Sequence, residues 1–294
     1  MPLHITEFPV PTPESGPYGI TLGPDGALWF TMVHSGRVGR ITTDGEVTEY
    51  PLDTPGTGPT VITPGPDGAL WFTEFRGHRV GRVTTDGEVT SHALPTPDAG
   101  PFGIVTGADG ALWCTEANAG RIARIAPDGR TTEHPLPLPD AFPSAITTGP
   151  DDRLWFTMNR ANAIGAVTYD GEVTVHPLPT PDAAPVGITA GGDGALWFVE
   201  IGAGQIGRIT PAGAVTEYPL PDRTARPHAI TLGPDGACWF TEWAANRVGR
   251  ITPAGEITTF PLPTPGSEPH GIALGPDGTL WTALETGTIA RLAG

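Results

Sequence analysis

Short stretches in which apolar and polar residues alternate follow one another along the whole chain, separated by Gly, Pro and Asp. Alternation with a period of two is typical of β-strands, and clusters of Gly, Pro and Asp are typical of turns. In the first such unit, Leu28 and Phe30 alternate with Trp29 and Thr31. The pattern predicts four strands there, over residues 19–22, 27–32, 38–42 and 47–52, with tight turns at 23–26 and 43–46. No stretch of useful length has the period of an amphipathic helix.

This four-stranded unit recurs seven times at a constant interval of 42 residues. Each repeat has an aspartate in its first turn: Asp25, Asp67, Asp109, Asp151, Asp193, Asp235 and Asp277. A tryptophan follows four residues later: Trp29, Trp71, Trp113, Trp155, Trp197, Trp239 and Trp281. Four strands in a period of about 40 to 45 residues are the signature of a propeller blade. The sequence therefore predicts an all-β, seven-bladed β-propeller that residues 1–294 form as a single domain.

The two ends of the chain predict how the ring closes. Residues 5–9 match the fourth strand of the first unit, residues 47–51, and the last repeat stops after its third strand at Leu292. We therefore expect the N-terminal strand to complete the seventh blade, which leaves no open edge in the ring.

Composition and charge limit the classes of molecule that the protein is expected to bind. The formal net charge is −16, and all 16 basic residues are Arg. Such a surface repels phosphate backbones and anionic lipid heads, so we expect neither nucleic acid nor membrane partners. The absence of Lys, with frequent Ala and Gly, also suggests a bacterium with a GC-rich genome.

The cysteines and the N-terminus indicate the compartment. Cys114 replaces a Phe and Cys238 a Leu of the repeat, so both are interpreted as small buried apolar residues that do not pair. No apolar N-terminal run suggests a signal peptide or a membrane span. We expect a cytoplasmic protein.

Positions that differ between otherwise equal repeats are candidates for function, because structural residues recur. Just before the first strand of each unit stand Tyr18, Thr60, Phe102, Ser144, Val186, His228 and His270. Two residues earlier the set is Gly16, Gly58, Gly100, Phe142, Ala184, Arg226 and Glu268. Four residues after the tryptophan it is Val33, Phe75, Ala117, Asn159, Ile201, Trp243 and Glu285.

All three sets belong to the same face of a propeller, around one mouth of its channel. Glu268, His270 and Glu285 are therefore expected to converge with His228, and Tyr18 to reach the same mouth from the first blade. Two carboxylates and two imidazoles form a plausible metal and acid–base site. Simpler interpretations stay open: a histidine here can be a hydrogen-bonded loop residue, and Tyr18 can pack on the channel wall. Trp243 is expected to shape a ligand pocket, although an exposed structural aromatic has the same pattern.

Other polar groups are interpreted as structural. One recurring column of glutamates is expected to make hydrogen bonds or salt bridges between blades: Glu74, Glu116, Glu200 and Glu242. Three histidines occupy the aromatic position of the fourth strand and are expected to pack there: His92, His134 and His176. Three more lie in segments expected to be exposed and receive no role: His4, His34 and His78.

Several of these segments carry a resemblance to a known family. Arg226–Ile230, Glu268–Ile272 and Gly16–Ile20, with Trp281 and Glu285, resemble the virginiamycin B lyase (streptogramin B lyase) family. The likeness covers essentially the whole chain, and its specific part is the set of His and Glu residues in the last two repeats.

The resemblance implies a monomeric, magnesium-dependent carbon–oxygen lyase that inactivates type B streptogramins, which are cyclic depsipeptide antibiotics. It would open the ring at the threonine ester by elimination, without water. His270 would be the general base, and Glu268 and Glu285 the magnesium-binding carboxylates. His228 and Glu285 would be further catalytic residues, and His228 and Tyr18 would contact the substrate.

This chemistry suits the residues. A threonine Cα–H beside an amide carbonyl is weakly acidic, so a cation near the developing negative charge would help the base. Histidine titrates near neutrality, and magnesium prefers oxygen ligands and keeps several waters. Four apolar side chains are expected to line a pocket for the cyclic peptide: Phe75, Phe102, Phe142 and Trp243.

Three alternatives stay open at this point. A propeller hydrolase, such as a metal-dependent lactonase, would use the same mouth to activate water. A non-catalytic ligand-binding propeller is possible because a fold alone does not decide function. A lyase of this type could also have a different natural substrate.

Overall fold

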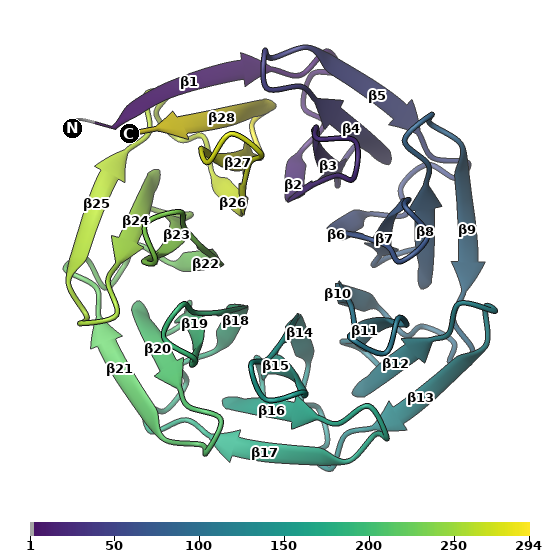
Figure 1. Cartoon of the computed structure of the whole chain (residues 1–294), viewed down its shortest axis with the longest axis vertical. Helices are drawn as coiled ribbons and strands as arrows, with labels where there is room; N and C mark the ends of the chain where they lie inside the picture. Colours follow the sequence, from purple (N-terminus) through teal and green to yellow (C-terminus); the bar gives the residue numbers. More distant parts are fainter. Residues whose placement is uncertain (1–2) are drawn as a thin grey trace.

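The computed structural model describes residues 3–294 and contains twenty-eight strands in seven four-stranded antiparallel sheets. The sheets stand around a central axis as blades (Figure 1). The seven-bladed β-propeller predicted from the repeats is confirmed. The described residues contain no helix that could cross a membrane.

The strands of blades one to six run from the channel outward in chain order, and in blade seven β1 lies outside β26, β27 and β28. The innermost strands are β2 (Pro17–Leu22), β6 (Pro59–Pro64), β10 (Pro101–Thr106), β14 (Pro143–Thr148), β18 (Pro185–Ala190), β22 (Pro227–Leu232) and β26 (Pro269–Leu274). The second strands are β3 (Leu28–Met32), β7 (Leu70–Glu74), β11 (Leu112–Glu116), β15 (Leu154–Met158), β19 (Leu196–Glu200), β23 (Cys238–Glu242) and β27 (Leu280–Leu284). The third strands are β4 (Arg37–Ile41), β8 (Arg79–Val83), β12 (Arg121–Ile125), β16 (Ala163–Val167), β20 (Gln205–Ile209), β24 (Arg247–Ile251) and β28 (Thr288–Ala293). The outermost strands are β5 (Val47–Pro51), β9 (Val89–Ala93), β13 (Thr131–Pro135), β17 (Val173–Pro177), β21 (Val215–Pro219), β25 (Ile257–Pro261) and β1 (His4–Pro9).

Closure of the ring occurs as predicted. β1 pairs antiparallel with β28, from His4 opposite Ala293 to Pro9 opposite Thr288. The first and last segments of the chain therefore share one sheet (Figure 1).

The innermost strands begin two residues earlier than predicted, at Pro17 rather than Gly19 in the first blade. The reason is an irregularity in the pairing. Pro17 faces Met32 and Ile20 faces Phe30, so two residues of β2 oppose one residue of β3. The same shift occurs in the other six blades. A bulge of this kind redirects a side chain, and here it affects the position of Tyr18 and its equivalents.

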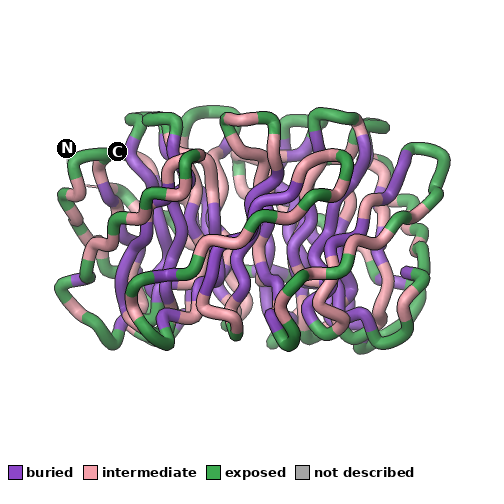
Figure 2. The backbone as a smooth tube through the Cα atoms, turned by 90° about the horizontal axis from the view of Figure 1, so that it is seen from below, coloured by how far each residue is buried: buried purple, intermediate pink, exposed green. Residues whose placement is uncertain are grey.

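The tryptophans form the repeated core of the blades. Each packs face to face on the aromatic residue of the outermost strand, with ring centroids 5.3–5.7 Å apart. The packing role predicted for His92, His134 and His176 is thereby confirmed. Figure 2 shows the strands buried between neighbouring blades and the turns exposed at both faces. Cys114 and Cys238 are buried and free, as expected.

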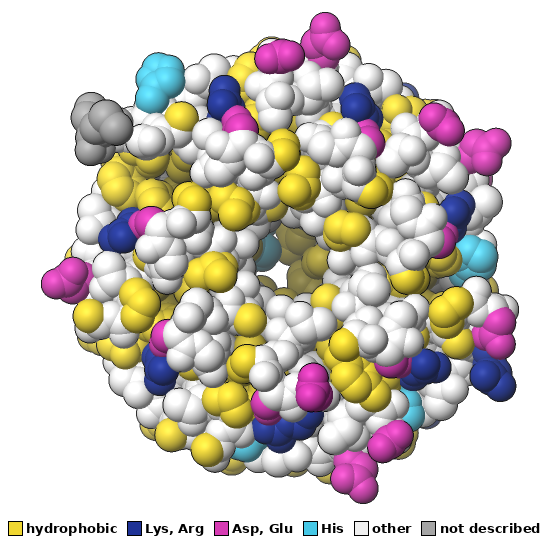
Figure 3. Space-filling model, viewed as in Figure 1, with side chains coloured by type: hydrophobic (Ala, Val, Ile, Leu, Met, Phe, Trp, Pro, Cys, Tyr) yellow, Lys and Arg dark blue, Asp and Glu magenta, His cyan; other side chains and the backbone are white. Residues whose placement is uncertain are grey.

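In blades one to six each tryptophan also belongs to a polar triad with the turn aspartate and an arginine. In blades one to six the indole Nε1 donates to the aspartate at 2.9–3.2 Å. The arginine normally comes from the third strand, as in Arg40 with Asp25 at 2.6 Å. Blade four has Ala166 at that position, and Arg153 beside the turn pairs with Asp151 instead. Basic and acidic side chains recur together around this face of the ring (Figure 3).

Candidate active site at the mouth of the channel

Backbone hydrogen bonds hold the predicted site columns together at one mouth. The residue after each second strand donates to the carbonyl that precedes the innermost strand. Glu285 donates to Glu268 at 3.1 Å, Trp243 to Arg226 at 3.1 Å, and Val33 to Gly16 at 2.8 Å. These columns therefore lie on one face of the propeller, as the repeat comparison predicted.

Three rings meet in the channel just below this mouth. Tyr18 stacks on His270 with ring centroids 4.5 Å apart, and His228 meets His270 edge-on at 4.5 Å. The Tyr18 hydroxyl and His228 Nε2 are 3.2 Å apart and share a hydrogen bond. Residues 210 positions apart in the sequence thus contact one another because the ring closes.

Glu285 connects this cluster to the surface. One carboxylate oxygen contacts His270 Nε2, and the other lies 3.0 Å from His34 Nε2. The hydrogen bond with His270 is the largest of the influences that hold the pKa of Glu285 below its usual value. Since the side chain of His270 is 8% exposed and that of Glu285 22%, the pair lies where the channel opens to solvent.

Loss of hydration among the packed rings controls the protonation of Tyr18 and His228. It lowers the pKa of His228 to about 3, with a further contribution from the nearby His270. It raises the pKa of the Tyr18 hydroxyl above its ordinary value, with a further contribution from Glu285. Both groups are therefore neutral near pH 7. Within residues 3–294 the Nδ1 atoms of His228 and His270 have no hydrogen-bond partner.

Glu268 lies at the same mouth but does not contact the cluster through its side chain. No hydrogen bond or ion pair within residues 3–294 involves its carboxylate, which is half-buried. Its backbone has a φ of 53°, which is unfavourable for a residue with a Cβ. Among the described residues, the hydrogen bond that links Glu268 to the cluster is the one that its backbone carbonyl accepts from Glu285. The convergence of its side chain with the histidines stays a prediction.

The residues present are chemically suited to a magnesium ion, although they do not enclose one. In the described residues no group of three or more His, Cys, Asp or Glu is arranged to hold a metal ion. Magnesium often uses one or two carboxylates and completes its shell with water. Glu268 and Glu285 offer such a pair, since the carboxylate of Glu268 has no competing partner and the two residues are joined through the backbone.

Aromatic side chains line the neighbouring wall. Trp243 is half-buried, with its ring centroid 6.4 Å from that of His270. Phe102 lies edge-on to Tyr18 at 6.3 Å, and Phe75 edge-on to Phe102 at 6.2 Å. Phe142 instead packs under the guanidinium of Arg160 at 4.6 Å. The channel below holds a cavity of about 160 Å³, lined mainly by the inner strands and by Tyr18, Phe102 and His228.

His34 is the site residue that sequence reasoning missed. It was assigned no role as one of three scattered histidines, yet it contacts Glu285 across the junction of blades one and seven. Its position follows Val33 directly, so it neighbours a column already recognised at the mouth. Comparing one further column among the repeats would have found it.

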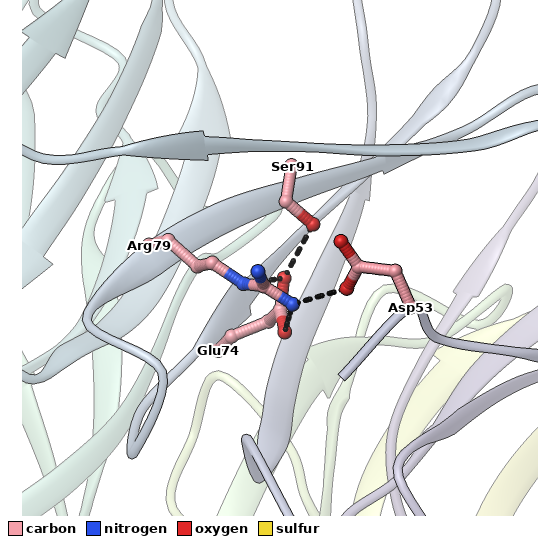
Figure 4. A network of polar contacts seen from close by, with 4 residues as sticks. All are labelled: Asp53, Glu74, Arg79 and Ser91. Atoms are coloured by element: carbon pink, nitrogen blue, oxygen red, sulfur yellow. Dashed lines mark hydrogen bonds and ion pairs between the residues drawn. The ribbon is translucent and has the colours of Figure 1, made fainter. Parts of the chain in front are cut away.

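The expectation for the glutamate column was partly wrong. Glu74 is held within its own blade by Arg79, whose Nε and Nη2 donate at 2.9 and 3.0 Å, and by Ser91 at 2.9 Å. Only Arg79 reaches outward, to Asp53 on the connection from blade one at 2.5 Å (Figure 4). These bonds stay within the blade because Glu74 and Arg79 face each other across adjacent strands. Glu116 has no hydrogen-bond partner within residues 3–294.

Comparison with known proteins agrees with this fold. Residues 3–292 match the model of the Virginiamycin B lyase family. A streptogramin B lyase structure superposes with a TM-score of 0.96 at 44% identity, over 99% of this chain and 97% of that one. Virginiamycin B lyase from Staphylococcus aureus gives the same TM-score and identity over 100% of both chains. A catalytically inactive H270A variant of that enzyme with quinupristin gives 0.95 at 43%, again over 100% of both.

Curated relatives give shorter matches. Virginiamycin B lyase of Saccharopolyspora erythraea is 62% identical over 44 residues, and that of Bordetella pertussis 51% over 45 residues. Each match spans 15% of this chain and 15% of the relative. The family match, by contrast, covers almost every residue. The chain belongs to the virginiamycin B lyase family.

Proposed function

We propose that this protein opens the ring of type B streptogramins by elimination at the threonine ester, with magnesium as cofactor. The observation that carries the proposal is the cluster of His270, Glu285, Tyr18 and His228 at one mouth of the channel. Membership of the family supports it, as does the similar enzyme whose H270A variant is inactive and was seen with quinupristin.

The reaction breaks one C–H and one C–O bond. A base removes the threonine Cα proton, its electron pair forms the Cα=Cβ double bond, and the Cβ–O bond breaks. The ester oxygen departs as a carboxylate, so the product is a linear peptide that carries a dehydrobutyrine. No water is consumed, and the mass of the antibiotic does not change.

His270 is the proposed base. Its Nδ1 is enclosed, so Nε2, which faces Glu285, is the nitrogen that is available to receive the proton. Stacking on Tyr18 and the edge of His228 fix the imidazole plane. Since burial keeps His228 neutral, it adds no positive charge that would make His270 a weaker base.

Glu268 and Glu285 are the proposed holders of magnesium. The bound cation would stabilise negative charge on the substrate carbonyl or on the leaving carboxylate. Trp243, Tyr18 and His228 are proposed to contact the substrate, and Phe75 and Phe102 continue the apolar wall beside Tyr18. Such a wall suits a cyclic peptide with aromatic and aliphatic side chains.

The proposal extends to a monomer that works in the cytoplasm without nucleic acid or membrane partners. Closure of the ring within one chain supports a monomer, because it leaves no blade incomplete. Two free buried cysteines suit a reducing compartment, and a net charge of −16 disfavours polyanionic partners. Light scattering after size exclusion would test the oligomeric state.

The deciding experiment is incubation with a type B streptogramin, with and without magnesium, followed by mass spectrometry. A linear product of unchanged mass, formed only with magnesium, is expected. A product heavier by one water would make the protein a hydrolase that uses the same mouth. No turnover would favour a different substrate or a ligand-binding role.

A further inference from the structure

Two positions of each blade compete for one space at the mouth. The first is the residue at Gly16 and its equivalents, which have φ values between 49° and 67° in all seven blades. The second is the residue at His34 and its equivalents. A Cβ added to Gly16 would lie 2.8 Å from His34 Nδ1, and one added to Gly100 would lie 2.5 Å from Asn118 Nδ2. In blades one to three, where the second position holds His34, Arg76 or Asn118, the first position is glycine. Blade four differs, because Phe142 at the first position packs under the guanidinium of Arg160 at the second.

The last two blades have the opposite arrangement. Arg226 and Glu268 occupy the first position there, and the second holds the smaller Ala244 and Thr286. In blade seven the larger of the two side chains is therefore at the first position, Glu268, and in blade one it is at the second, His34.

His34 is the residue at the second position that reaches the catalytic cluster. Its Nε2 lies 3.0 Å from Glu285 Oε1, while Glu285 Oε2 contacts His270. Arg76, the equivalent residue of blade two, instead donates to the backbone oxygens of Val33 and Gly56 at 3.0 and 3.2 Å. Each oxygen of Glu285 therefore has its own imidazole partner, and these partners come from different blades.

We propose that His34 is a positioning residue that fixes the Glu285 carboxylate between blades one and seven, so that it is oriented to bind magnesium. The inference rests on the proposed function, in which Glu285 is a metal ligand. A glutamate held at one oxygen loses side-chain freedom before the ion arrives, which strengthens binding. Partners that orient metal ligands typically contribute tenfold to a hundredfold in metal affinity or activity.

Three variants separate this role from a merely structural one. His34→Ala removes the imidazole. His34→Gln keeps a side-chain N–H that can donate to Glu285. Gly16→Ala keeps the imidazole but displaces it, because the new Cβ would occupy the place of the ring. Gly100→Ala is the matched control, since it creates the same backbone strain and displaces Asn118 in blade three.

Magnesium affinity is measured by calorimetry with magnesium chloride alone, and kcat and KM with a type B streptogramin at saturating magnesium. We expect His34→Ala and Gly16→Ala to bind magnesium about tenfold to a hundredfold more weakly, with thermal midpoints like that of Gly100→Ala. His34→Gln should retain most of the affinity. Saturating magnesium should restore most of kcat in all of them, with KM little changed.

Unchanged magnesium affinity in His34→Ala would overturn the inference, as would wild-type protein that binds no magnesium. An equal loss in His34→Gln and His34→Ala would also contradict it, because the donated hydrogen bond would then not be the cause. Failure of the proposed function is distinct: wild-type protein would bind magnesium, with the affinity differences described, and yet leave the streptogramin intact.

Discussion

The same sequence repeat builds two different regions: the interior of the blades, or body, in which equivalent residues recur, and the mouth of the channel, in which they differ. In the body, the tryptophan of each blade packs on the aromatic residue of the outermost strand. An ion pair between the turn aspartate and an arginine also recurs, and in blade four Arg153 provides it from a different position of the repeat. At the mouth, equivalent positions hold Tyr18, His228 and His270 in three blades and unrelated residues elsewhere. The comparison teaches that stability is spread evenly around the ring, whereas the proposed chemistry is confined to one arc of it.

The glutamates that end the second strands lie where the two regions meet. In blade two, Glu74 is fully buried and neutralised by Arg79, with Asp53 and Ser91 completing the network (Figure 4). In blade three, Arg121 lies nearer Glu133, at 3.7 Å, and the buried Glu116 has no partner among the described residues. Glutamates at equivalent positions of the repeat therefore differ in charge. Glu74 forms an ion pair, whereas Glu116 favours its neutral, protonated form.

Removing the proposed base should give the largest effect and affect the mouth alone. We expect His270→Ala to lower kcat by about 10²–10⁴-fold, the usual contribution of a general base. The thermal midpoint should change by no more than a few degrees, because the ring lies at the channel opening. Steady-state kinetics and calorimetry on the same preparation test this. Normal turnover in this variant would show that His270 is not the catalytic base.

Breaking the network of blade two should affect the body alone. Arg79→Ala leaves Glu74 buried with its charge uncompensated, and we expect a loss of about 3 kcal/mol in the free energy of unfolding. The double variant Arg79→Ala with Glu74→Gln should recover part of this loss, since the buried charge is gone. Urea denaturation measures both. Activity per folded molecule should remain unchanged. A parallel loss of kcat would contradict the view that the body determines stability and the mouth determines activity.

The contribution of blade three to the stability of the protein should depend on pH. Burial, with the charge of Glu133, raises the pKa of Glu116 to about 8. The folded protein therefore keeps a proton that the unfolded chain releases above its ordinary pKa of about 4.5, so stability falls as the pH rises from there to about 8. Glu116→Gln removes this fall and should stabilise the protein by on the order of 2 kcal/mol at pH 8.

Denaturation curves at pH 4.5 and pH 8 test whether stability falls as the pH rises. The advantage of Glu116→Gln should largely disappear at the lower pH, where the folded state holds the proton and the unfolded chain holds it in about half of the molecules. Glu46→Gln, which removes the same charge from an exposed turn, is the control and should show little difference at either pH. A stabilisation that is equal at both values would attribute the effect to packing rather than to the proton.

The smallest effect is expected at a single repeated triad. Arg40→Ala removes the pair with Asp25 at 2.6 Å, whose side chains are 25% and 18% exposed. Since partly exposed ion pairs contribute about 0.5 kcal/mol, and five complete triads remain in blades two to six, the midpoint of urea denaturation should shift only slightly. A loss above about 2 kcal/mol would show that the triads act cooperatively.

The sequence was sufficient for the blades, the closure and most of the mouth because each is a property of the repeat. Tyr18, His228 and His270 could be recognised since they differ from their own column, and the bulge then brings their rings together. The contact of His34 with Glu285 could not be predicted, because it depends on a side chain that folds back over Gly16 and crosses into another blade. The bonds of Glu74 within its blade likewise depend on strand register rather than on composition.

Closure of the ring by β1 and β28 has a consequence for the biosynthesis of the protein. At a translation rate of about 5–20 residues per second, a chain of 294 residues takes about 15 to 60 s to complete. During that time β1 has no β28 to pair with. Tyr18 and His34 likewise lack the histidines and glutamates of the last two blades, because these residues have not yet been synthesised. A nascent chain or a C-terminally clipped fragment therefore carries no complete mouth, and any catalytic activity at this mouth would report that a molecule has been synthesised to its last strand.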